Sequence, residues 1–242
     1  MITDDELRAQ VGTFPWYHTI DLGNGVRTPG MFDHRGTEDR HLLPADLSGL
    51  RCLDVGTMDG FWAFAMEQRG AKEVVALDIE DPSALDWPAS LRPKVVKTLD
   101  ETKARRFALV REALGSSVER VPRSVYELDD DLGHFDLVFC GDLLVHLKDP
   151  VTALERLRRV CRGTAVVCNP VQRFVGLGLG RRPLAQFDGI DEFAWWVTNL
   201  AGLRRMALAA GFGRVELGRP FNVRATAGGP WKGRRGAMRA YP

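Results

Sequence analysis

The amino-acid sequence predicts an α/β fold in which a doubly wound, mainly parallel sheet is covered by helices on both faces. Three observations support this prediction. From residue 50 onward, apolar runs typical of buried strands alternate with segments of helical periodicity. A turn that contains two glycines joins the first of these strands to the first of these helices. Hydrophobic residues make up 45% of the 242 residues, which is enough for one large core.

Residues 1–45 are predicted to form an N-terminal helix and a hairpin or lid that precede the sheet. Thr3 and Glu6 have the spacing of a capping box, which favours a short helix directly after Thr3. Alternation over 17–22, followed by a turn of Gly-Asn-Gly, favours a hairpin or an ordered lid. The elements expected here are a helix over 4–11, a hairpin or lid over 17–30, and a polar helix or turn over 38–43.

Residues 46–242 are predicted to form the main domain. Strands are expected over 50–55, 73–79, 118–125, 135–140 and 164–168, and helices over 60–69, 101–114, 151–161 and 200–210. In the second of these helices, Phe107, Val110 and Leu114 follow the i, i+3, i+7 pattern of one buried face. Residues 171–188 are rich in glycine and arginine, which favours a loop. Residues 214–217 and 236–241 are expected to close the sheet as an antiparallel pair.

Composition and charge exclude several classes of protein. A net charge of +1 argues against a protein dedicated to coating nucleic acid. The acidic N-terminus does not resemble a signal peptide, and no run of about 18 apolar residues is present to span a bilayer. The four cysteines have no ligand spacing and no C-x-x-C pair occurs, so no metal site is expected. We therefore expect a cytoplasmic protein, and the sequence leaves its oligomeric state open.

The turn after the first predicted strand has the composition of a ligand site. Asp54 ends the strand, and Gly56 and Gly60 bracket a tight turn in which the backbone can approach a ligand closely. A nicotinamide-dependent dehydrogenase is the alternative, but Thr57 and Met58 stand where its fingerprint needs a second glycine. Carboxylates at Asp54 and Asp59 would also repel a pyrophosphate. They suit a cationic cofactor such as S-adenosylmethionine, which carries a sulfonium and an ammonium.

Residues at the ends of the later strands complete the predicted site. Asp78, with Ile79 after it, ends the second strand, where a carboxylate can accept hydrogen bonds from both hydroxyls of a ribose. Ser124 and Val125 are placed to flank an adenine. The segment from Cys140 to His146 lies at the mouth of the expected site. His146 either acts as a general base, since histidine titrates near neutrality, or hydrogen-bonds a neighbouring loop.

Taken in order, the segments PWYHTI, LDVGTMDGFWAFAMEQRG and FDLVFCGDLLVHLKDP resemble class I methyltransferases related to the bacterial tRNA wobble-uridine modifying enzyme. The similarity extends from about residue 14 to residue 212. It implies a Rossmann-like fold, S-adenosylmethionine as methyl donor, and cofactor contacts from Asp54, Gly56, Gly60, Asp78, Ser124 and Val125. The tRNA enzyme holds a carboxylated cofactor with lysine, tryptophan and tyrosine. The matching region of this chain has no tryptophan or lysine, and Val145 replaces the tyrosine, so plain methyl transfer is expected.

Residues from two segments, aromatic except for Asn199, are candidates for the wall of the acceptor site, although ordinary core or lid packing is an equally open interpretation. These candidates are Trp16, Tyr17, His18, Phe193, Trp195, Trp196 and Asn199. In the predicted loop, Arg173, Arg181 and Arg182 either bind a phosphate or carboxylate or face solvent. The basic group near the C-terminus is either a solvated tail or hairpin or a patch that contacts phosphate, and it consists of Lys232, Arg234, Arg235 and Arg239.

Three functions remain open at this point. The favoured one is a methyltransferase acting on a small-molecule acceptor, in a biosynthetic pathway of specialised metabolism. The second is an RNA-modifying methyltransferase. The third is a protein that binds S-adenosylmethionine but cyclises or cleaves it, or that has lost catalysis. A nucleic-acid partner is not expected, because the net charge is close to zero.

Overall fold

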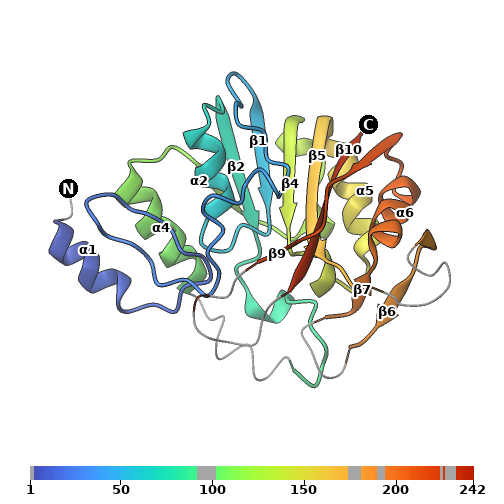
Figure 1. Ribbon diagram of the computed structural model, residues 1–242. Helices are drawn as coiled ribbons and strands as arrows, with labels where there is room; N and C mark the ends of the chain where they lie inside the picture. The colour runs from blue at the N-terminus through green and yellow to red at the C-terminus, as the bar shows by residue number, and fades with distance from the viewer. Residues whose placement is uncertain (1–2, 92–101, 174–180, 190–193, 224–225, 227–232) are drawn as a thin grey trace.

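The computed structural model describes residues 3–91, 102–173, 181–189, 194–223, 226 and 233–242, and it confirms the predicted α/β architecture (Figure 1). The strands of the main sheet are β1 (Arg51–Val55), β2 (Glu73–Asp78), β3 (Glu119–Pro122), β4 (Phe135–Gly141), β5 (Cys161–Pro170), β8 (Arg214–Leu217), β9 (Phe221–Asn222) and β10 (Arg234–Tyr241). A separate antiparallel pair consists of β6 (Ala185–Phe187) and β7 (Trp196–Thr198). The α-helices are α1 (Asp4–Val11), α2 (Phe61–Gln68), α4 (Thr102–Leu114), α5 (Pro150–Val160) and α6 (Leu200–Ala209). Short 3₁₀ helices are η1 (Pro82–Ala84), η2 (Val125–Glu127), η3 (Asp130–Leu132) and η4 (Leu144–His146).

The order of the strands places a ligand crevice between β1 and β4. Along the sheet the order is β3-β2-β1-β4-β5-β10-β8, with β9 paired to β10. The pairs from β3 to β5 are parallel, whereas β10 is antiparallel to both β5 and β8. The antiparallel pair of β8 and β10 was predicted. From β1 the chain adds β2 and β3 on one side, and it then adds β4 and β5 on the other side. The carboxyl ends of β1 and β4 therefore form the crevice in which sheets of this type bind ligands.

Alternation along the strands separates two cores. Leu53 and Val55 of β1 pack in the cluster that includes α5 and α6, whereas Cys52 packs in the cluster with α1, α2 and α4. Figure 1 shows these two sets of helices on opposite sides of the sheet. Because side chains of a strand alternate between faces, Asp54 lies on the same side as Cys52. The side chain of Asp54 is therefore directed toward α2 and the N-terminal segment.

Three predicted boundaries differ from the structure. β3 ends at Pro122, earlier than expected, because Ser124 caps η2 and accepts a hydrogen bond from the Tyr126 N–H at 3.3 Å. β5 begins at Cys161, directly after α5, three residues before the predicted start. The segment predicted as loop over 171–188 contains β6, which pairs with β7. A short exposed strand such as β6 has no alternation that a sequence pattern could reveal.

The N-terminal segment packs against the sheet domain. Its predicted helix is confirmed as α1, and the capping box is present, with the Thr3 N–H donating to Glu6 at 2.9 Å. Leu7 and Val11 of this helix are buried in the same cluster as Trp62 of α2. The domain boundary near residue 45 stays a prediction. Among the described residues, no helix is both long enough and apolar enough to cross a membrane.

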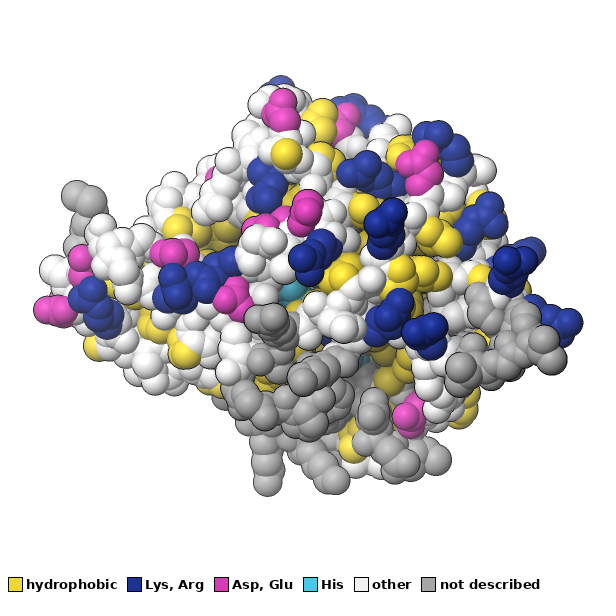
Figure 2. Space-filling model, in the orientation of Figure 1, with side chains coloured by type: hydrophobic (Ala, Val, Ile, Leu, Met, Phe, Trp, Pro, Cys, Tyr) yellow, Lys and Arg dark blue, Asp and Glu magenta, His cyan; other side chains and the backbone are white. Residues whose placement is uncertain are grey.

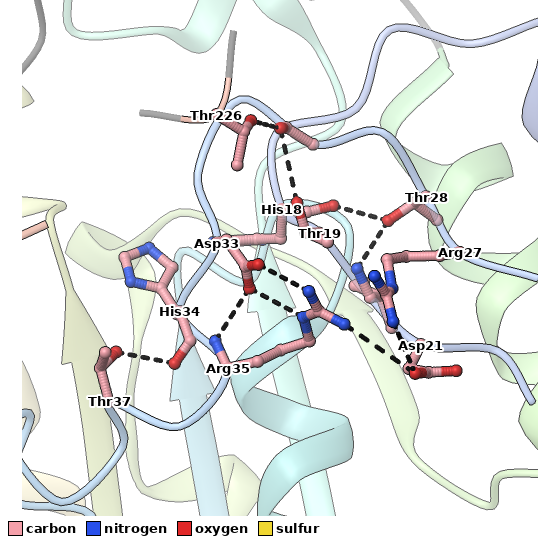
Figure 3. A network of polar contacts seen from close by, with 12 residues as sticks. His18, Thr19, Asp21, Arg27, Thr28, Asp33, His34, Arg35, Thr37 and Thr226 are labelled. Carbon is pink, nitrogen blue, oxygen red and sulfur yellow. Dashed lines mark hydrogen bonds and ion pairs between the residues drawn. The ribbon is translucent and has the colours of Figure 1, made fainter. Parts of the chain in front are cut away.

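Residues 18–32 form a closed loop in which a buried threonine holds two backbone groups. An antiparallel bridge between Asp21 and Arg27 confirms the predicted turn. The two sides of the turn pair through this isolated bridge and not through two regular strands. The Thr28 hydroxyl accepts a hydrogen bond from the Ile20 N–H and donates one to the His18 carbonyl, both at 2.7 Å (Figure 3). Gly30 lies so close to His18 that an added Cβ would be 1.9 Å from its carbonyl carbon. The backbone of His18 is therefore confined on both sides.

Replacing Thr28 with valine should destabilise the protein measurably. Thr28 is fully buried, so the isosteric change leaves the Ile20 N–H and the His18 carbonyl without a partner and without water. We expect the free energy of unfolding to fall by about 2 kcal/mol in urea denaturation. Thr13→Val is the matched control, because its hydroxyl also donates to a backbone carbonyl but is exposed, and its effect should stay within about 0.5 kcal/mol. Equal losses of unfolding free energy in the two variants would contradict a stabilising role for the two hydrogen bonds of Thr28.

Candidate functional site

The glycine turn after β1 is shaped for close approach of a ligand. Gly56 and Gly60 adopt φ values of +80° and +95°, which are strained for any residue with a Cβ. A Cβ on Gly60 would also lie 2.3 Å from the ring of Phe64. The turn is fastened by hydrogen bonds from the Gly56 N–H to the Leu77 carbonyl and from the Gly60 N–H to the Thr57 carbonyl, both 2.8 Å. Thr57 itself is buried, so the predicted cofactor residues Gly56, Thr57 and Gly60 form one rigid cradle.

Asp54 brings a buried carboxyl group to this cradle. Its side chain is 1% exposed, and its Oδ2 atom has no hydrogen-bond partner among the described residues. Burial raises the pKa of Asp54 to about 7, because a carboxylate without water is costly. A buried oxygen of this kind is a polar group that a cationic ligand would satisfy.

Asp59, the second predicted carboxylate of the turn, binds the N-terminal segment. Its Oδ2 accepts hydrogen bonds from the N–H groups of Tyr17 and His18, both at 2.9 Å, and its Oδ1 forms a buried ion pair with Nδ1 of His18. Burial by itself would raise the pKa of Asp59, but the nearby His18 imidazole and these donors lower it below its ordinary value. Asp54 is therefore the carboxyl group of the turn that is left without a cationic partner among the described residues.

Asp78, the predicted ribose ligand, already has two partners. Its Oδ2 accepts a hydrogen bond from the Met58 N–H at 2.8 Å, and its Oδ1 lies 2.9 Å from Nζ of Lys103 on α4. A carboxylate has about four acceptor positions, so two remain for other donors. Ile79, which follows Asp78, is half-buried. Lys103 was missed by sequence analysis, because a lysine in a charged helical segment has the pattern of a solvated face.

The predicted adenine residues differ in their surroundings. Ser124 is the N-cap of η2, and Val125 is buried in the core beside α5. Cys140 is fully buried near the end of β4, and burial raises the pKa of its thiol. The roles of Ser124, Val125 and Cys140 in binding stay predictions.

A buried ion pair follows β4. Asp142, which has a φ of +52°, accepts a hydrogen bond from Nε of Arg235 at 2.7 Å, while its buried Oδ1 has no partner among the described residues. Burial, and then the charge of Asp142, raise the pKa of Tyr17, whose side chain lies nearby. Arg239 of the same basic C-terminal group donates to the Leu42 carbonyl at 3.0 Å. Two of these arginines therefore have internal partners, and Lys232 lies outside the described residues.

Asp142 was not singled out from the sequence, although a signal was present. Asp54 and Asp78 lie at the carboxyl ends of predicted strands of the parallel sheet, and Asp142 follows the predicted strand over 135–140 by two residues. In such sheets this position lies at the ligand-binding edge. Arg235 gave no comparable signal, because it lies in a basic stretch that predicts a solvated tail.

The aromatic candidates divide between two places. Trp16 is buried against α1 and donates to the Val11 carbonyl at 2.8 Å, so it belongs to the N-terminal core. Trp195 donates to the Asp86 carbonyl, and Trp196 donates to the Lys148 carbonyl at 3.0 Å, beside η4. Asn199 caps α6 by accepting from the Gly202 N–H at 2.7 Å. Phe193 lies outside the described residues, while Arg173, Arg181 and Arg182 are exposed.

The structure thus brings the predicted residues together in two groups at the carboxyl edge of the sheet. Asp54, Asp59, Tyr17 and His18 surround the turn after β1. His146 lies on η4 after β4, half-buried, with its ring 5.9 Å from that of Trp87. The backbone N–H of Trp195 donates to the Val145 carbonyl at 2.8 Å, which places the β6–β7 pair next to η4. The assignment of His146 as a base stays a prediction.

Comparisons with known proteins agree with this architecture. A curated tRNA U34 carboxymethyltransferase from Campylobacter hominis is 30% identical over 113 residues, which are 47% of this chain and 33% of that protein. A ubiquinone biosynthesis O-methyltransferase from Psychrobacter arcticus is 26% identical over 192 residues, covering 76% of this chain and 65% of that protein. The matches therefore span less than two thirds of the length of these relatives.

Solved structures share the fold. The N-terminal domain of EvdMO1, solved in the presence of S-adenosylhomocysteine and D-fucose, matches with a TM-score of 0.68 at 20% identity, covering 100% of this chain and 97% of that domain. The magnesium protoporphyrin IX methyltransferase of Synechocystis, solved with S-adenosylmethionine bound, matches with a TM-score of 0.52 at 15% identity, covering 81% and 72% of the two chains. The family described as "Methyltransferase domain" matches residues 35–217, which is more than half of the sequence. The glycine turn, the switch point between β1 and β4 and this match together show that the chain belongs to the methyltransferase domain family.

Proposed function

We propose that this protein transfers a methyl group from S-adenosylmethionine to a small-molecule acceptor in a specialised biosynthetic pathway. The observation that carries the proposal is the acidic cradle after β1. It combines two glycines in the left-handed region with the buried, unpartnered oxygen of Asp54. A cationic methyl donor would satisfy that oxygen, whereas a pyrophosphate would be repelled by it.

The expected contact with the ribose of the cofactor fits the same carboxyl edge of the sheet. Asp78 retains two acceptor positions for ribose hydroxyls beside its contacts with Met58 and Lys103. When bound, S-adenosylmethionine would supply a methyl group on a sulfonium, which is an electrophile without further activation. The residues of this chain would bind it, exclude water and hold the acceptor in line, and positioning of this kind is worth on the order of 7–11 kcal/mol.

A small-molecule acceptor is supported by the relatives and by the surroundings of the site. The names of similar proteins mention ubiquinone biosynthesis, D-fucose and magnesium protoporphyrin. The N-terminal segment brings the buried side chain of Tyr17 near the Asp142–Arg235 pair and near Asp59 of the cradle. Such a covered position favours a compact acceptor over a polymer.

An RNA acceptor is the second candidate, because relatives of this chain are named tRNA U34 carboxymethyltransferases. Figure 2 shows that many Lys and Arg side chains gather over the side of the molecule where β10 and α6 lie. However, Arg235 and Arg239 of this region have internal partners. An RNA-binding constant that falls steeply as the salt concentration rises would favour this candidate.

A thermal-shift comparison tests the proposed cofactor. At 100 times its dissociation constant a ligand adds about 2.7 kcal/mol of stability, or roughly 5–10 °C for a domain of this size. We expect such shifts with S-adenosylmethionine and S-adenosylhomocysteine, and none with NAD or NADP. A shift with the dinucleotides alone would overturn the proposal. Rapid loss of S-adenosylmethionine without any acceptor would instead indicate that the protein cyclises or cleaves it.

Binding of S-adenosylmethionine should weaken as the pH falls. With its pKa raised to about 7, Asp54 is protonated below that pH in the free protein, whereas a cationic ligand favours the carboxylate. Affinity measured by calorimetry should therefore drop roughly tenfold from about pH 7.5 to about pH 6. Asp54→Asn should abolish this dependence, while Asp46→Asn, at an exposed carboxyl group, should retain it. The same slope in Asp54→Asn would exclude Asp54 as the titrating group.

Removing the carboxylate of Asp78 should weaken binding of S-adenosylhomocysteine, which shares the ribose. We expect a loss of roughly 1.5–3 kcal/mol for Asp78→Asn, the range of charged hydrogen bonds. Because this change leaves Lys103 buried without its partner, the double variant Asp78→Asn/Lys103→Met removes both charges and should fold better. Glu80→Gln, at an exposed carboxylate two residues later, is the control and should change affinity by less than about 0.5 kcal/mol. Full affinity in the folded double variant would exclude the ribose contact.

A further inference from the structure

His18 has the surroundings of an oriented base. Its backbone carbonyl accepts from Thr28 at 2.7 Å, and Gly30 packs directly against its backbone. Its N–H donates to Asp59 at 2.9 Å, and its Nδ1 pairs with the same carboxylate. These contacts fix both the backbone of His18 and one nitrogen of its imidazole ring.

The ring of His18 is also fixed in its plane. Three aromatic rings surround it, with centroids 4.8 Å away for Tyr17, 5.5 Å for His34 and 5.6 Å for Phe61. Phe61 and Asp59 are the two neighbours of Gly60 in the sequence, so the imidazole lies directly on the cofactor cradle. It also lies close enough to Asp54, at the end of β1, to interact with that carboxyl group. The N-terminal segment therefore brings the imidazole to the turn that is proposed to hold the cofactor.

The second nitrogen of the ring is available for chemistry. Because Nδ1 meets Asp59, Nε2 points away from that carboxylate. Nε2 has no hydrogen-bond partner among the described residues, although the side chain of His18 is only 5% exposed. Asp59 is ionised, so it accepts the Nδ1 proton and selects the tautomer in which Nε2 is bare. A base, an orienting carboxylate and a covered position are the components of general-base catalysis.

We propose that His18 is the general base of the methyl transfer and that Asp59 is the positioning residue that orients it. This inference rests on the proposed function. An acceptor O–H would donate its proton to Nε2 of His18 while an oxygen lone pair forms the bond to the methyl carbon. The bond from that carbon to sulfur breaks with its electrons remaining on sulfur, which yields neutral S-adenosylhomocysteine. Nε2 then releases the proton to solvent.

The presence of a base defines the class of acceptor. A neutral amine has a free lone pair and needs little help from a base, whereas a hydroxyl group must lose its proton as the new bond forms. A buried histidine oriented by a carboxylate would be of little use to an amine acceptor. We therefore assign the acceptor to the hydroxyl-bearing small molecules, such as sugars or catechols.

Charged and titratable groups face His18 from every element packed around it. They are Asp54 at the end of β1, Asp59 in the glycine turn, Tyr17 and His34 in the N-terminal segment, and Arg106 of α4, whose charge acts on Asp59. Burial, and then the neighbouring His18, lower the pKa of His34, so His34 stays neutral beside it. The substitutions used to test the base must therefore leave these groups in place.

The first experiment needs no acceptor. In protein labelled with ¹⁵N-histidine and saturated with S-adenosylhomocysteine, the ring of His18 is identified by the loss of its signals in His18→Asn. Near about pH 7.5 we expect a proton on Nδ1 and none on Nε2. Asp59→Asn should change this tautomer. A ring that keeps protons on both nitrogens up to about pH 9, or one with the proton on Nε2 alone, would overturn the proposal.

The second experiment measures methyl transfer to deoxysugars, catechols and amino sugars. His18→Asn keeps an amide N–H that can reach Asp59 but has no base, so kcat with a hydroxyl acceptor should fall at least about 100-fold with unchanged affinity for S-adenosylhomocysteine. In this variant the acid limb of the kcat profile should disappear when S-adenosylmethionine is saturating at every pH. Asp59→Asn should lower kcat by at least about tenfold. His134→Asn, at an exposed histidine on the opposite edge of the sheet, is the control and should match the wild type.

The outcomes separate this inference from the proposed function. If wild-type protein does not bind S-adenosylmethionine, the proposed function fails. If it binds the cofactor and His18→Asn retains full turnover and the acid limb, only the role of His18 fails. Loss of the acid limb in His146→Asn instead would assign the base to His146. Methylation of amino sugars by a cofactor-binding protein that modifies no hydroxyl acceptor would also overturn the role of His18.

Discussion

The buried carboxylate of Asp59 fastens the N-terminal segment to the turn that follows β1. It accepts two backbone N–H groups, from Tyr17 and His18, and pairs with the imidazole of His18. A carboxylate buried to 0% exposure is stable only when its charge and its lone pairs are satisfied, and these three donors satisfy them. This contact therefore ties the segment over 16–34 to the glycine turn after β1.

The same contact sets the charge of the site. With Asp59 held by the N–H groups of Tyr17 and His18, the carboxyl group of the turn with an unpartnered oxygen among the described residues is Asp54, whose pKa burial raises to about 7. Asp142 offers a second buried oxygen beside β4, held in place by Arg235. Two acidic groups thus flank the switch point between β1 and β4, one beside the proposed methyl donor and one beside the proposed acceptor. A site of this charge selects a cationic cofactor over a pyrophosphate by simple electrostatics.

Much of the fold could be predicted because its signals are local. The glycine turn, the capping box at Thr3 and the apolar strands report their structure through short-range sterics, hydrogen bonds and periodicity. The position of Asp54 and Asp78 at one edge followed from the parallel order of the strands. The end of β3 was harder to predict, because the cap at Ser124 competes with a strand whose apolar pattern continues past it. β6 was missed because all three of its residues are exposed and carry no periodic signal.

The sequence by itself determined the fold class, the methyltransferase family and the edge of the sheet at which a cofactor is expected. Those features depend on residues that are neighbours in the chain or repeat at a fixed period. Only the tertiary structure decided which partners the charged residues take. Asp59 meets His18 across 41 positions, Asp78 meets Lys103 across 25, and Asp142 meets Arg235 across 93. Such pairs form because burial forces each charge to find a partner, and which partner lies within reach depends on how distant segments pack, which no local pattern encodes.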